Sequence, residues 1–593
     1  GGKEYEPLTR QEREKWEREL RSVPANRRVL ELVDDGEFWV LFFLKMTSEQ
    51  RPEFSTRVAT FFKSYFQVAG IALVNALKEK LATLCSRHGE QPEQVLAAHI
   101  IAGAGRGCKH WAYDDVRRLY EEVIVPLVTD AIENATPECF DAWLGALNFI
   151  VYDRDIRRQH WLHSALFSAA FNREESSLLQ SRRIKSVVAV ISEYSWRGMC
   201  FGEELTERLI STTGLLIDRK VVREATAHLL AMVLGATFEG TRLEGSGIPS
   251  LQGSMQLAAS QVALVDELVR LLDGTNEKIG AFLQKVTSAA LKADAAGGDA
   301  APAMSPEEVR EDMLALKQER AAGRKLVLHW IVYSCRIGGV MVLTDYIDRL
   351  VPYLFAMRDD DDPELLDLAV AAVGYIANSR MPRARVAALL QVCYGLLDSP
   401  ATDWHARASV LPFLQVVVFK NILDLGREQL EQLIAALLRS LVDRQLEVRV
   451  AASTTLAGVL KFVSDQRYLT DLRRRFCAMA ETNLPPKRQL SAALLGPGRG
   501  SVIAALLKRH GGVLGMIALV GMHPYGIPEW LPELLVDLVM HINDPSPIKE
   551  SVKKAFLEFW RVHQDAWADE QLLFTPEQLS VLTELLVAPS YFG

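Results

Sequence analysis

Apolar residues recur along most of the chain at the spacing of an amphipathic helix. In the segments that begin at Thr56, Tyr113 and Arg427, apolar side chains fall at positions i, i+3, i+4 and i+7. No convincing run of alternating apolar and polar residues indicates a β-strand. Short turns with Pro, Gly or Asp separate helices of about 12–20 residues, which is typical of consecutive αα-hairpins. The sequence therefore predicts an all-α fold.

Several of the predicted second helices share one spacing of acidic, apolar and basic residues. An Asp in the turn can cap the helix that follows, and the Val or Ala faces the interior. The basic residue can reach the carboxylate of a neighbouring turn. Because each hairpin leaves one apolar face bare until the next hairpin stacks on it, we expect a HEAT-like or armadillo-like helical repeat solenoid, long and curved. The acidic and basic positions are Asp218 with Arg223, Asp443 with Arg449, and Asp544 with Lys553.

Two stretches without helical period interrupt the predicted repeats. Residues 239–254 and 292–308 are rich in Gly, Ala, Ser and Pro, and both are interpreted as flexible loops. We expect HEAT-like repeats over 1–288, a loop over 289–306, HEAT-like repeats over 307–587 and a C-terminal tail over 588–593. The glycine-rich stretches Gly103–Cys108 and Leu494–Ser501 lack the spacing of nucleotide-binding loops, and we interpret both as plain turns.

Composition and charge narrow the class of protein. Hydrophobic residues make up 49% and charged residues 24%, which are globular values. A net charge of −8 gives no reason to expect nucleic-acid binding, so any anion site would be a local basic pocket. Seven cysteines without a CxxC pair indicate neither a zinc site nor disulfides, and suit a reducing compartment. The longest uncharged apolar stretch, from Gly511, is about a dozen residues, too short for a membrane span.

The sequence contains little that points to catalysis. No HExxH or G-x-S-x-G motif is present, and the histidines are dispersed, so we expect no catalytic residues and no metal site. No secretory signal is visible, and because the chain starts without Met we expect it to be a piece of something longer.

Several stretches together carry a resemblance to a known family. The chain resembles the C-terminal third of the large HEAT-repeat proteasome activators, the proteasome activator complex subunit 4 family. The resemblance implies an ATP-independent, dome-like activator that caps the α ring of the 20S proteasome core particle. It also implies ubiquitin-independent degradation, roles in histone binding and DNA repair, and a place in nucleus and cytoplasm, with no direct nucleic-acid or membrane partner. The stretches are 100–111, 153–162, 195–198, 509–520, 523–556 and 574–593.

A helix is predicted to begin just before the C-terminal tail. Thr575 is suited to the N-cap, Pro576 to the first helical position, and Gln578 to completing a capping box. Pro589 should stop this helix and favour an extended conformation at Ala588.

The last residues, Tyr591, Phe592 and Gly593, pose the question of why a chain should finish on two aromatic rings. The resemblance implies that this tail enters a pocket between two α subunits, where its carboxylate meets a lysine. Phe592 stands where the family has a penultimate tyrosine. The missing hydroxyl removes one hydrogen bond, a net loss of roughly 0.5–1.5 kcal/mol, so we expect docking to survive with weaker gate opening. The alternative is that the tail folds back onto its own helix.

The resemblance also implies two further binding properties. Residues 446–488 would correspond to a bromodomain-like, acetylated-histone-binding stretch, but Val463 and Ser464 stand where the family has an Asn-Phe pair, and Asn483 is the nearest candidate. No cofactor is required, but inositol phosphates are carried in basic openings of the family's dome. Ordinary solvated surface is the alternative. The candidate residues are Arg473, Arg474, Arg475, Lys487, Arg488, Lys508 and Arg509, and separately Arg182, Arg183 and Lys185.

A second class of function shares the same fold. A HEAT-repeat transport receptor or scaffold of the importin type would use the same hairpins, without needing an aromatic C-terminus. Copurification with α subunits distinguishes the first function, and binding of a small GTPase the second.

Overall fold

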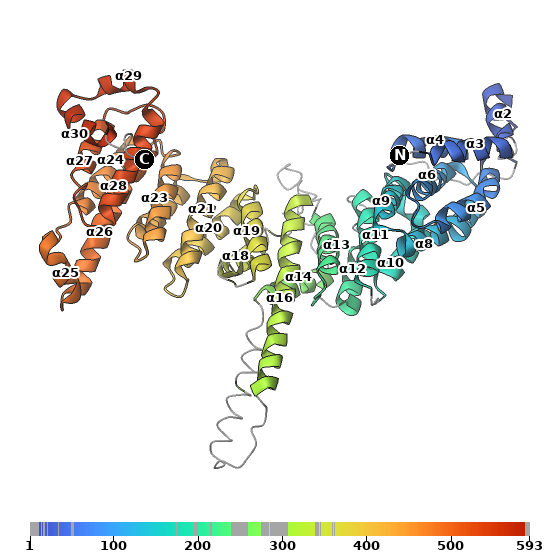
Figure 1. Ribbon diagram of the computed structural model, residues 1–593, viewed down its shortest axis with the longest axis horizontal. Helices are drawn as coiled ribbons and strands as arrows, with labels where there is room; N and C mark the ends of the chain where they lie inside the picture. Colours follow the sequence, from blue (N-terminus) through green and yellow to red (C-terminus); the bar gives the residue numbers. More distant parts are fainter. Residues whose placement is uncertain are drawn as a thin grey trace, which may run out of the picture. The chain divides into compact units, whose positions relative to one another are not determined.

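The computed structural model describes residues 22–238, 259–273, 306–337 and 346–587, with short gaps at 34, 49–52, 173–175, 195–197, 199, 214–215, 358–359 and 361, and a few isolated positions elsewhere. Within these ranges every regular element is a helix, so the predicted all-α class is confirmed (Figure 1). Contacts divide the chain into two compact units, Gly1–Val342 and Leu343–Gly593. The first predicted loop, 239–254, lies outside the described residues, as does 292–305 of the second, whose residues 306–308 belong to α16.

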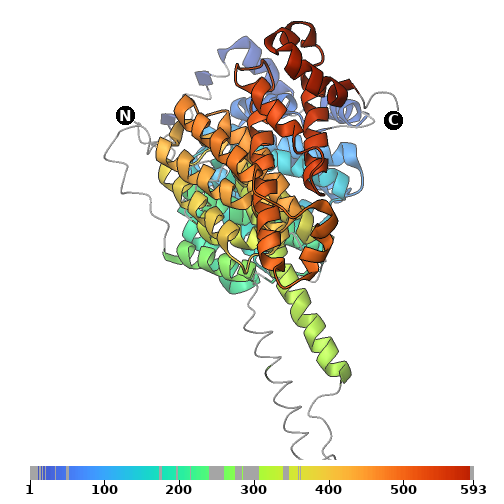
Figure 2. The ribbon, with the colours of Figure 1, turned by 90° about the vertical axis from the view of Figure 1, so that its left-hand side faces the viewer.

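The first unit is built from helices that stack in rows. One row runs α4, α6, α9, α11, α13 and α16, each packing on the next, and α5, α8 and α10 stack beside it. The N-terminal part of α16 extends beyond its neighbours (Figures 1 and 2). The helices of this unit are α2 (Pro24–Glu31), α3 (Gly36–Met46), α4 (Thr56–Ala69), α5 (Ile71–Ser86), α6 (Gln91–Gly107), η1 (Cys108–His110), α7 (Tyr113–Leu119), η2 (Tyr120–Ile124), α8 (Val125–Asn134), α9 (Pro137–Val151), η3 (Ile156–Gln159), α10 (His160–Ala170), α11 (Ser177–Tyr194), α12 (Gly202–Arg208), η5 (Leu209–Thr213), α13 (Lys220–Phe238), α14 (Ala259–Asp273) and α16 (Pro306–Ile337).

The glycines of Gly103–Cys108 do not form the predicted turn. They continue α6 to its end, and the interpretation of this stretch as a turn is wrong. A Cβ on Gly103 would lie 2.3 Å from Phe62 Cβ, and one on Gly107 would lie 2.7 Å from Phe66 Cβ. Helix α4 therefore packs so closely on α6 that only glycine fits at the contact, and this gain in packing outweighs the poor helix propensity of glycine.

The second unit has two rows of hairpin helices. Helices α18, α20 and α22 stack in one row, and α19, α21, α23, α26 and α28 in the other, which is the predicted helical-repeat architecture. Figure 2 shows the same helices turned by 90°. They are α18 (Ile347–Ala356), α19 (Pro363–Ala377), α20 (Arg383–Asp398), α21 (Trp404–Asn421), η9 (Ile422–Asp424), α22 (Arg427–Ser440), α23 (Leu446–Leu460), α24 (Gln466–Ala480), α25 (Lys487–Leu495), α26 (Arg499–Gly521), α27 (Leu531–Val539), α28 (Ile548–His563), α29 (Trp567–Glu570), η10 (Gln571–Leu573) and α30 (Pro576–Val587).

The apolar stretch from Gly511 is the contact face of α26. A Cβ on Gly512 would lie 2.3 Å from the backbone nitrogen of Ala480, and one on Gly515 would lie 2.2 Å from the ring of Phe476. Both partners belong to α24, so α24 and α26 touch almost backbone to backbone. The turn between α25 and α26 includes Gly496 and Gly498, as predicted for this part of the stretch, while Gly500 already lies in α26.

Ion pairs connect successive hairpins of the second unit. Arg407 of α21 binds the carboxylate of Asp443, with Nε to Oδ2 at 3.0 Å. Arg509 of α26 binds Asp544 in the same way, with Nε to Oδ2 at 2.6 Å and Nη2 to Oδ1 at 2.7 Å. In each case the arginine lies on a helix of one hairpin and the aspartate in the turn that leads into a later helix.

The basic residues of the predicted motif act differently from the prediction. Arg449 Nη1 donates to the backbone carbonyl oxygens of Asp443 and Arg444, at 2.7 and 3.0 Å, and Arg223 Nη1 donates to those of Ile217 and Asp218. The expectation of a contact with a neighbouring turn's carboxylate is wrong for Arg449, because helical side chains lean toward the N-terminus and so return to their own turn. The inward-facing apolar positions, such as Val448 and Val552, are confirmed as buried.

Two helices in the described part of the chain are long and apolar enough to cross a membrane by length and composition, Trp404–Asp424 and Arg499–Gly521. Both belong to the helical stack, where α21 packs on α20 and α23, and α26 on α23 and α24. A core helix of a repeat array has the same composition.

Candidate functional site

The predicted docking residues Tyr591, Phe592 and Gly593 lie outside the described residues. Helix α30 is the last described element before them. The structure therefore shows the support of the tail.

Helix α30 begins with the predicted capping box. The backbone N–H of Gln578 donates to Thr575 Oγ1 at 3.3 Å, and the backbone N–H of Thr575 donates to Gln578 Oε1 at 2.9 Å. Two donors that the start of a helix leaves without partners are satisfied reciprocally. The predicted helix start, with Pro576 at its first position, is confirmed.

The segment that leads into α30 is tied to α28 by aromatic contacts. The ring of Trp567 lies 5.6 Å from that of Trp560 and 5.5 Å from that of Phe574. His563 Nδ1 lies 2.8 Å from Glu570 Oε2, a polar contact beneath the same segment. Helix α30 packs on α27 and α28. These contacts fix the position of the start of α30.

The predicted polyphosphate cluster is not brought together as one site. Arg509 is held by Asp544 and also donates to the carbonyl oxygen of Thr482 at 3.1 Å. Arg473 Nη2 binds Glu533 Oε2 at 2.9 Å. A guanidinium that binds a carboxylate of its own chain has part of its charge neutralised and fewer donors left for a phosphate. The side chain of Lys487 lies outside the described residues, and Arg488 is exposed on α25.

Two of the three basic residues predicted in α11, Arg182 and Arg183, already contact other side chains of the first unit. Arg182 is buried with its guanidinium 5.3 Å from the centre of the Phe140 ring, and Arg183 Nη2 binds Glu133 Oε1 at 2.7 Å. Both side chains serve contacts between helices of the first unit.

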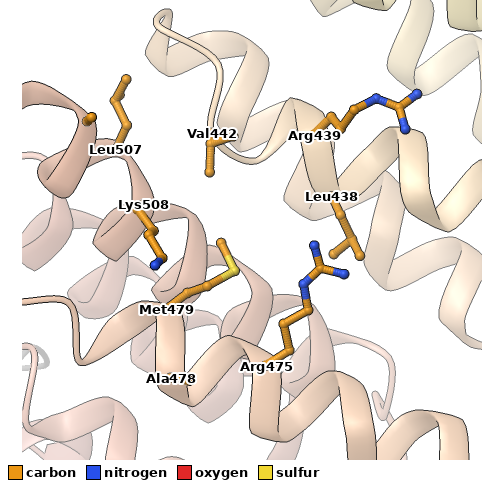
Figure 3. Close-up of a pocket in the computed structure, with 9 residues that line it drawn as sticks. Leu438, Arg439, Val442, Arg475, Ala478, Met479, Leu507 and Lys508 are labelled. Atoms are coloured by element: carbon orange, nitrogen blue, oxygen red, sulfur yellow. The ribbon is translucent and has the colours of Figure 1, made fainter.

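Two residues of the predicted cluster, Arg475 and Lys508, line one hollow of about 650 Å³. Figure 3 shows Arg475 of α24 pointing into the space beneath the turn that carries Val442, with Met479 beside it. Arg439, which the sequence analysis did not single out, also lines the hollow. Arg439 binds Asp398, which lies 41 residues earlier, about the length of one repeat. An acidic and a basic residue separated by about one repeat length is the sequence signal that could have identified Arg439.

The segment 446–488 forms two helices of the repeat stack, α23 and α24, with the start of α25. Helix α23 packs on α21 and α26 as a member of its row. Asn483 is exposed in the loop that follows α24. Acetyl-lysine binding by this segment stays a prediction. Among the described residues, no group of three or more His, Cys, Asp or Glu could hold a metal ion.

Comparison with solved structures gives only low overall similarity. A karyopherin Kap121p bound to the extreme C-terminus of the protein phosphatase Cdc14p has a TM-score of 0.41 at 13% identity, covering 95% of this chain and 53% of that one. An importin β structure has a TM-score of 0.32 at 14% identity, covering 88% of this chain and 64% of that one. Similarity at this level carries no functional inference.

Comparison of sequences gives a family. The model "Proteasome activator complex subunit 4-like, HEAT repeat-like" matches residues 8–189, and "Proteasome activator complex subunit 4-like, C-terminal" matches residues 506–593. Proteasome activator complex subunit 4 of Bos taurus is 30% identical over 569 residues, 93% of this chain and 28% of the relative. The human protein of the same name is 29% identical over 93% of this chain and 28% of its own length. Proteasome activator BLM10 of Saccharomyces cerevisiae is 21% identical over 92% of this chain and 24% of its own length.

The chain spans about a quarter of the length of these relatives, 28% of the human and bovine proteins and 24% of BLM10. The resemblance found in the sequence is confirmed over nearly the whole chain, which matches two models of the proteasome activator complex subunit 4 family and is similar to its members.

Proposed function

We propose that this chain is part of a proteasome activator that caps the 20S core particle and docks residues 591–593 between two α subunits. Its action is binding and gate opening, without ATP and without chemistry of its own. The names of its relatives support the activator role. The observation that carries the tail's part in it is the anchored helix α30, held by its capping box and by α27 and α28.

Pre-organisation of the tail's support favours docking. A short peptide that must be ordered on binding loses affinity through the entropy of its immobilised side chains. In this proposal the packing of α30 on α27 and α28 limits the segment that must be ordered on docking to the residues that follow the helix. Two aromatic rings then supply a large apolar area to a pocket.

The test uses purified chain and purified proteasome core particles without ATP. We expect the chain to copurify with the core particle and to accelerate hydrolysis of a fluorogenic peptide. Deletion of residues 591–593 should abolish the acceleration, and Tyr591→Ala with Phe592→Ala should do the same. Unchanged hydrolysis after both changes would contradict a role for the tail, and no copurification at all would contradict the activator function.

Ubiquitin-independent degradation, acetylated histones as substrates, and a place in nucleus and cytoplasm belong to the same proposal. Binding of acetylated against plain histone tails tests the second, and imaging of the tagged protein the third. The importin-type alternative would be favoured by binding to a small GTPase, measured on the same preparation.

A further inference from the structure

The hollow of about 650 Å³ lies between three helices of the second unit. Helix α22 and the turn after it form one side, α24 the second and α26 the third. Its volume falls in the range of about 300–1,000 Å³ that is typical of ligand pockets. The lining residues are Leu438, Arg439, Val442, Arg475, Ala478, Met479, Ala504, Leu507 and Lys508.

Two cations at this hollow are uncommitted. Arg475 and Lys508 are exposed, and neither has a hydrogen-bond or ion-pair partner among the residues that the structure describes. Arg439 differs from them, because its Nε and Nη2 bind the two carboxylate oxygens of Asp398 at 2.9 and 2.8 Å. Figure 3 shows the guanidinium of Arg439 turned away from Arg475. The hollow thus carries positive charge that no carboxylate of the described chain neutralises.

Most of the remaining lining is apolar. Val442 is 36% exposed in its turn, and Met479 is half-buried below it. Met and Arg are enriched at protein interfaces, where a flexible thioether adapts to different side chains and a guanidinium binds carboxylates. Apolar side chains beside free cations match a ligand that is both acidic and apolar.

We propose that the hollow binds a short acidic segment of another protein, with one aliphatic or aromatic side chain seated on Met479 and Val442 and its carboxylates on Arg475 and Lys508. This inference is independent of docking to the proteasome. A polyphosphate fits less well, because it would meet only two uncommitted cations and would place further negative charge against apolar walls.

The test is a selection of random heptapeptides displayed on phage against the intact chain. We expect enriched peptides to contain two or more acidic residues next to a Leu, Ile, Phe or Met. The best of them, synthesised with a fluorophore, is titrated by fluorescence anisotropy. Arg475→Glu with Lys508→Glu should weaken its binding about tenfold or more. Ala504→Trp, which fills the hollow from an exposed position of α26 without a change of charge, should weaken it comparably.

The matched control is Lys553→Glu with Lys554→Glu, an equal charge reversal at exposed positions of α28 outside the hollow. The affinity of this control variant for the peptide should stay within about twofold of that of the parent chain. Circular dichroism should show that every variant is folded. Enrichment of peptides without acidic residues would overturn the proposal, as would equal weakening by the control pair. Inositol hexakisphosphate binding that depends on Arg475 and Lys508, with no acidic peptide enriched, would assign the hollow to polyphosphates instead.

Discussion

Arg509 of α26 binds both carboxylate oxygens of Asp544, which lies 35 residues later in the turn before α28. Arg407 of α21 and Asp443, in the turn before α23, repeat this relationship two hairpins earlier, at a separation of 36 residues. A planar guanidinium that binds a carboxylate through two parallel bonds fixes direction as well as distance. Each such pair therefore fixes the register between a helix and the turn of a later hairpin.

Replacement of Arg509 by Ala should destabilise the second unit by about 2–4 kcal/mol, because the partly buried carboxylate of Asp544 then loses both bonds to the guanidinium and keeps its contact with His541 Nδ1 at 2.8 Å. The side chains of the pair are only 19% and 12% exposed. Urea unfolding followed by circular dichroism measures the change. The control is Arg474→Ala, whose pair with Asp471 is 75% and 73% exposed and should contribute less than about 1 kcal/mol. Equal losses in the two variants would contradict a structural role for the pair.

Gly512→Ala should be destabilising, although Ala is the better helix former. The added methyl would lie 2.3 Å from the backbone nitrogen of Ala480, so α24 and α26 must separate. We expect a loss of about 1–3 kcal/mol, as for overpacked cores. Gly374→Ala in α19 is the matched control, because no atom lies within 4 Å of its added Cβ. That variant should gain about 0.5–1 kcal/mol. A higher free energy of unfolding in both variants would show that α24 and α26 can separate at Gly512 without loss of stability.

The stability of the second unit should fall in mild acid through His510. Burial, and after it the positive charge of Arg449, lowers the pKa of this imidazole to about 3. Arg449 Nε donates to His510 Nδ1 at 3.0 Å, and His510 Nε2 lies 3.0 Å from Ser551 Oγ. An exposed imidazole has a pKa of about 6.5, so between these values the unfolded chain binds a proton that the folded chain does not. Stability is therefore complete above pH 6.5 and decreases as the pH falls toward 3.

Between pH 7.5 and 5 this group should account for a loss on the order of 1–2 kcal/mol. His510→Asn keeps an acceptor for Arg449 but cannot be charged, so its stability should depend less on pH, whatever its value at pH 7.5. Guanidinium unfolding at both pH values measures this. The same slope in His510→Asn as in the parent would exclude His510 as the cause.

The sequence was sufficient for features that depend on local periodicity. Helical spacing predicted the all-α stack, and the Thr575 and Gln578 side chains predicted their own capping box, because the groups involved lie within one turn of each other. The glycines of Gly103–Cys108 misled because a glycine needed for close packing against α4 has the same local signature as one needed for a turn. Only the contact with Phe62, about forty residues earlier in the chain, distinguishes the two.

The grouping of basic residues at the candidate site could not be predicted from neighbouring positions in the sequence either. Basic residues near one another in sequence, such as Arg473 and Arg475, face different partners, because successive residues of a helix point in different directions. Arg473 binds Glu533 of α27, and Arg475 lines the hollow beside Lys508. The hollow itself depends on α22, α24 and α26 meeting, which no single segment encodes. The tail residues could be named from the family resemblance, and their docking stays a prediction.

Phe592→Tyr should strengthen activation of the proteasome if the tail docks as proposed. The added hydroxyl gives one hydrogen bond, roughly 0.5–1.5 kcal/mol, which corresponds to about two- to tenfold in apparent affinity. The area buried by the ring is unchanged, so maximal binding should persist in both forms. Titration of core particles with each form, followed by peptide hydrolysis, measures the half-saturating concentration and the maximal rate. Tyr591→Phe, which removes a hydroxyl from the neighbouring ring, is the control for a general effect of tail polarity. Equal activation by the parent and Phe592→Tyr would show that the penultimate hydroxyl has no part in gate opening.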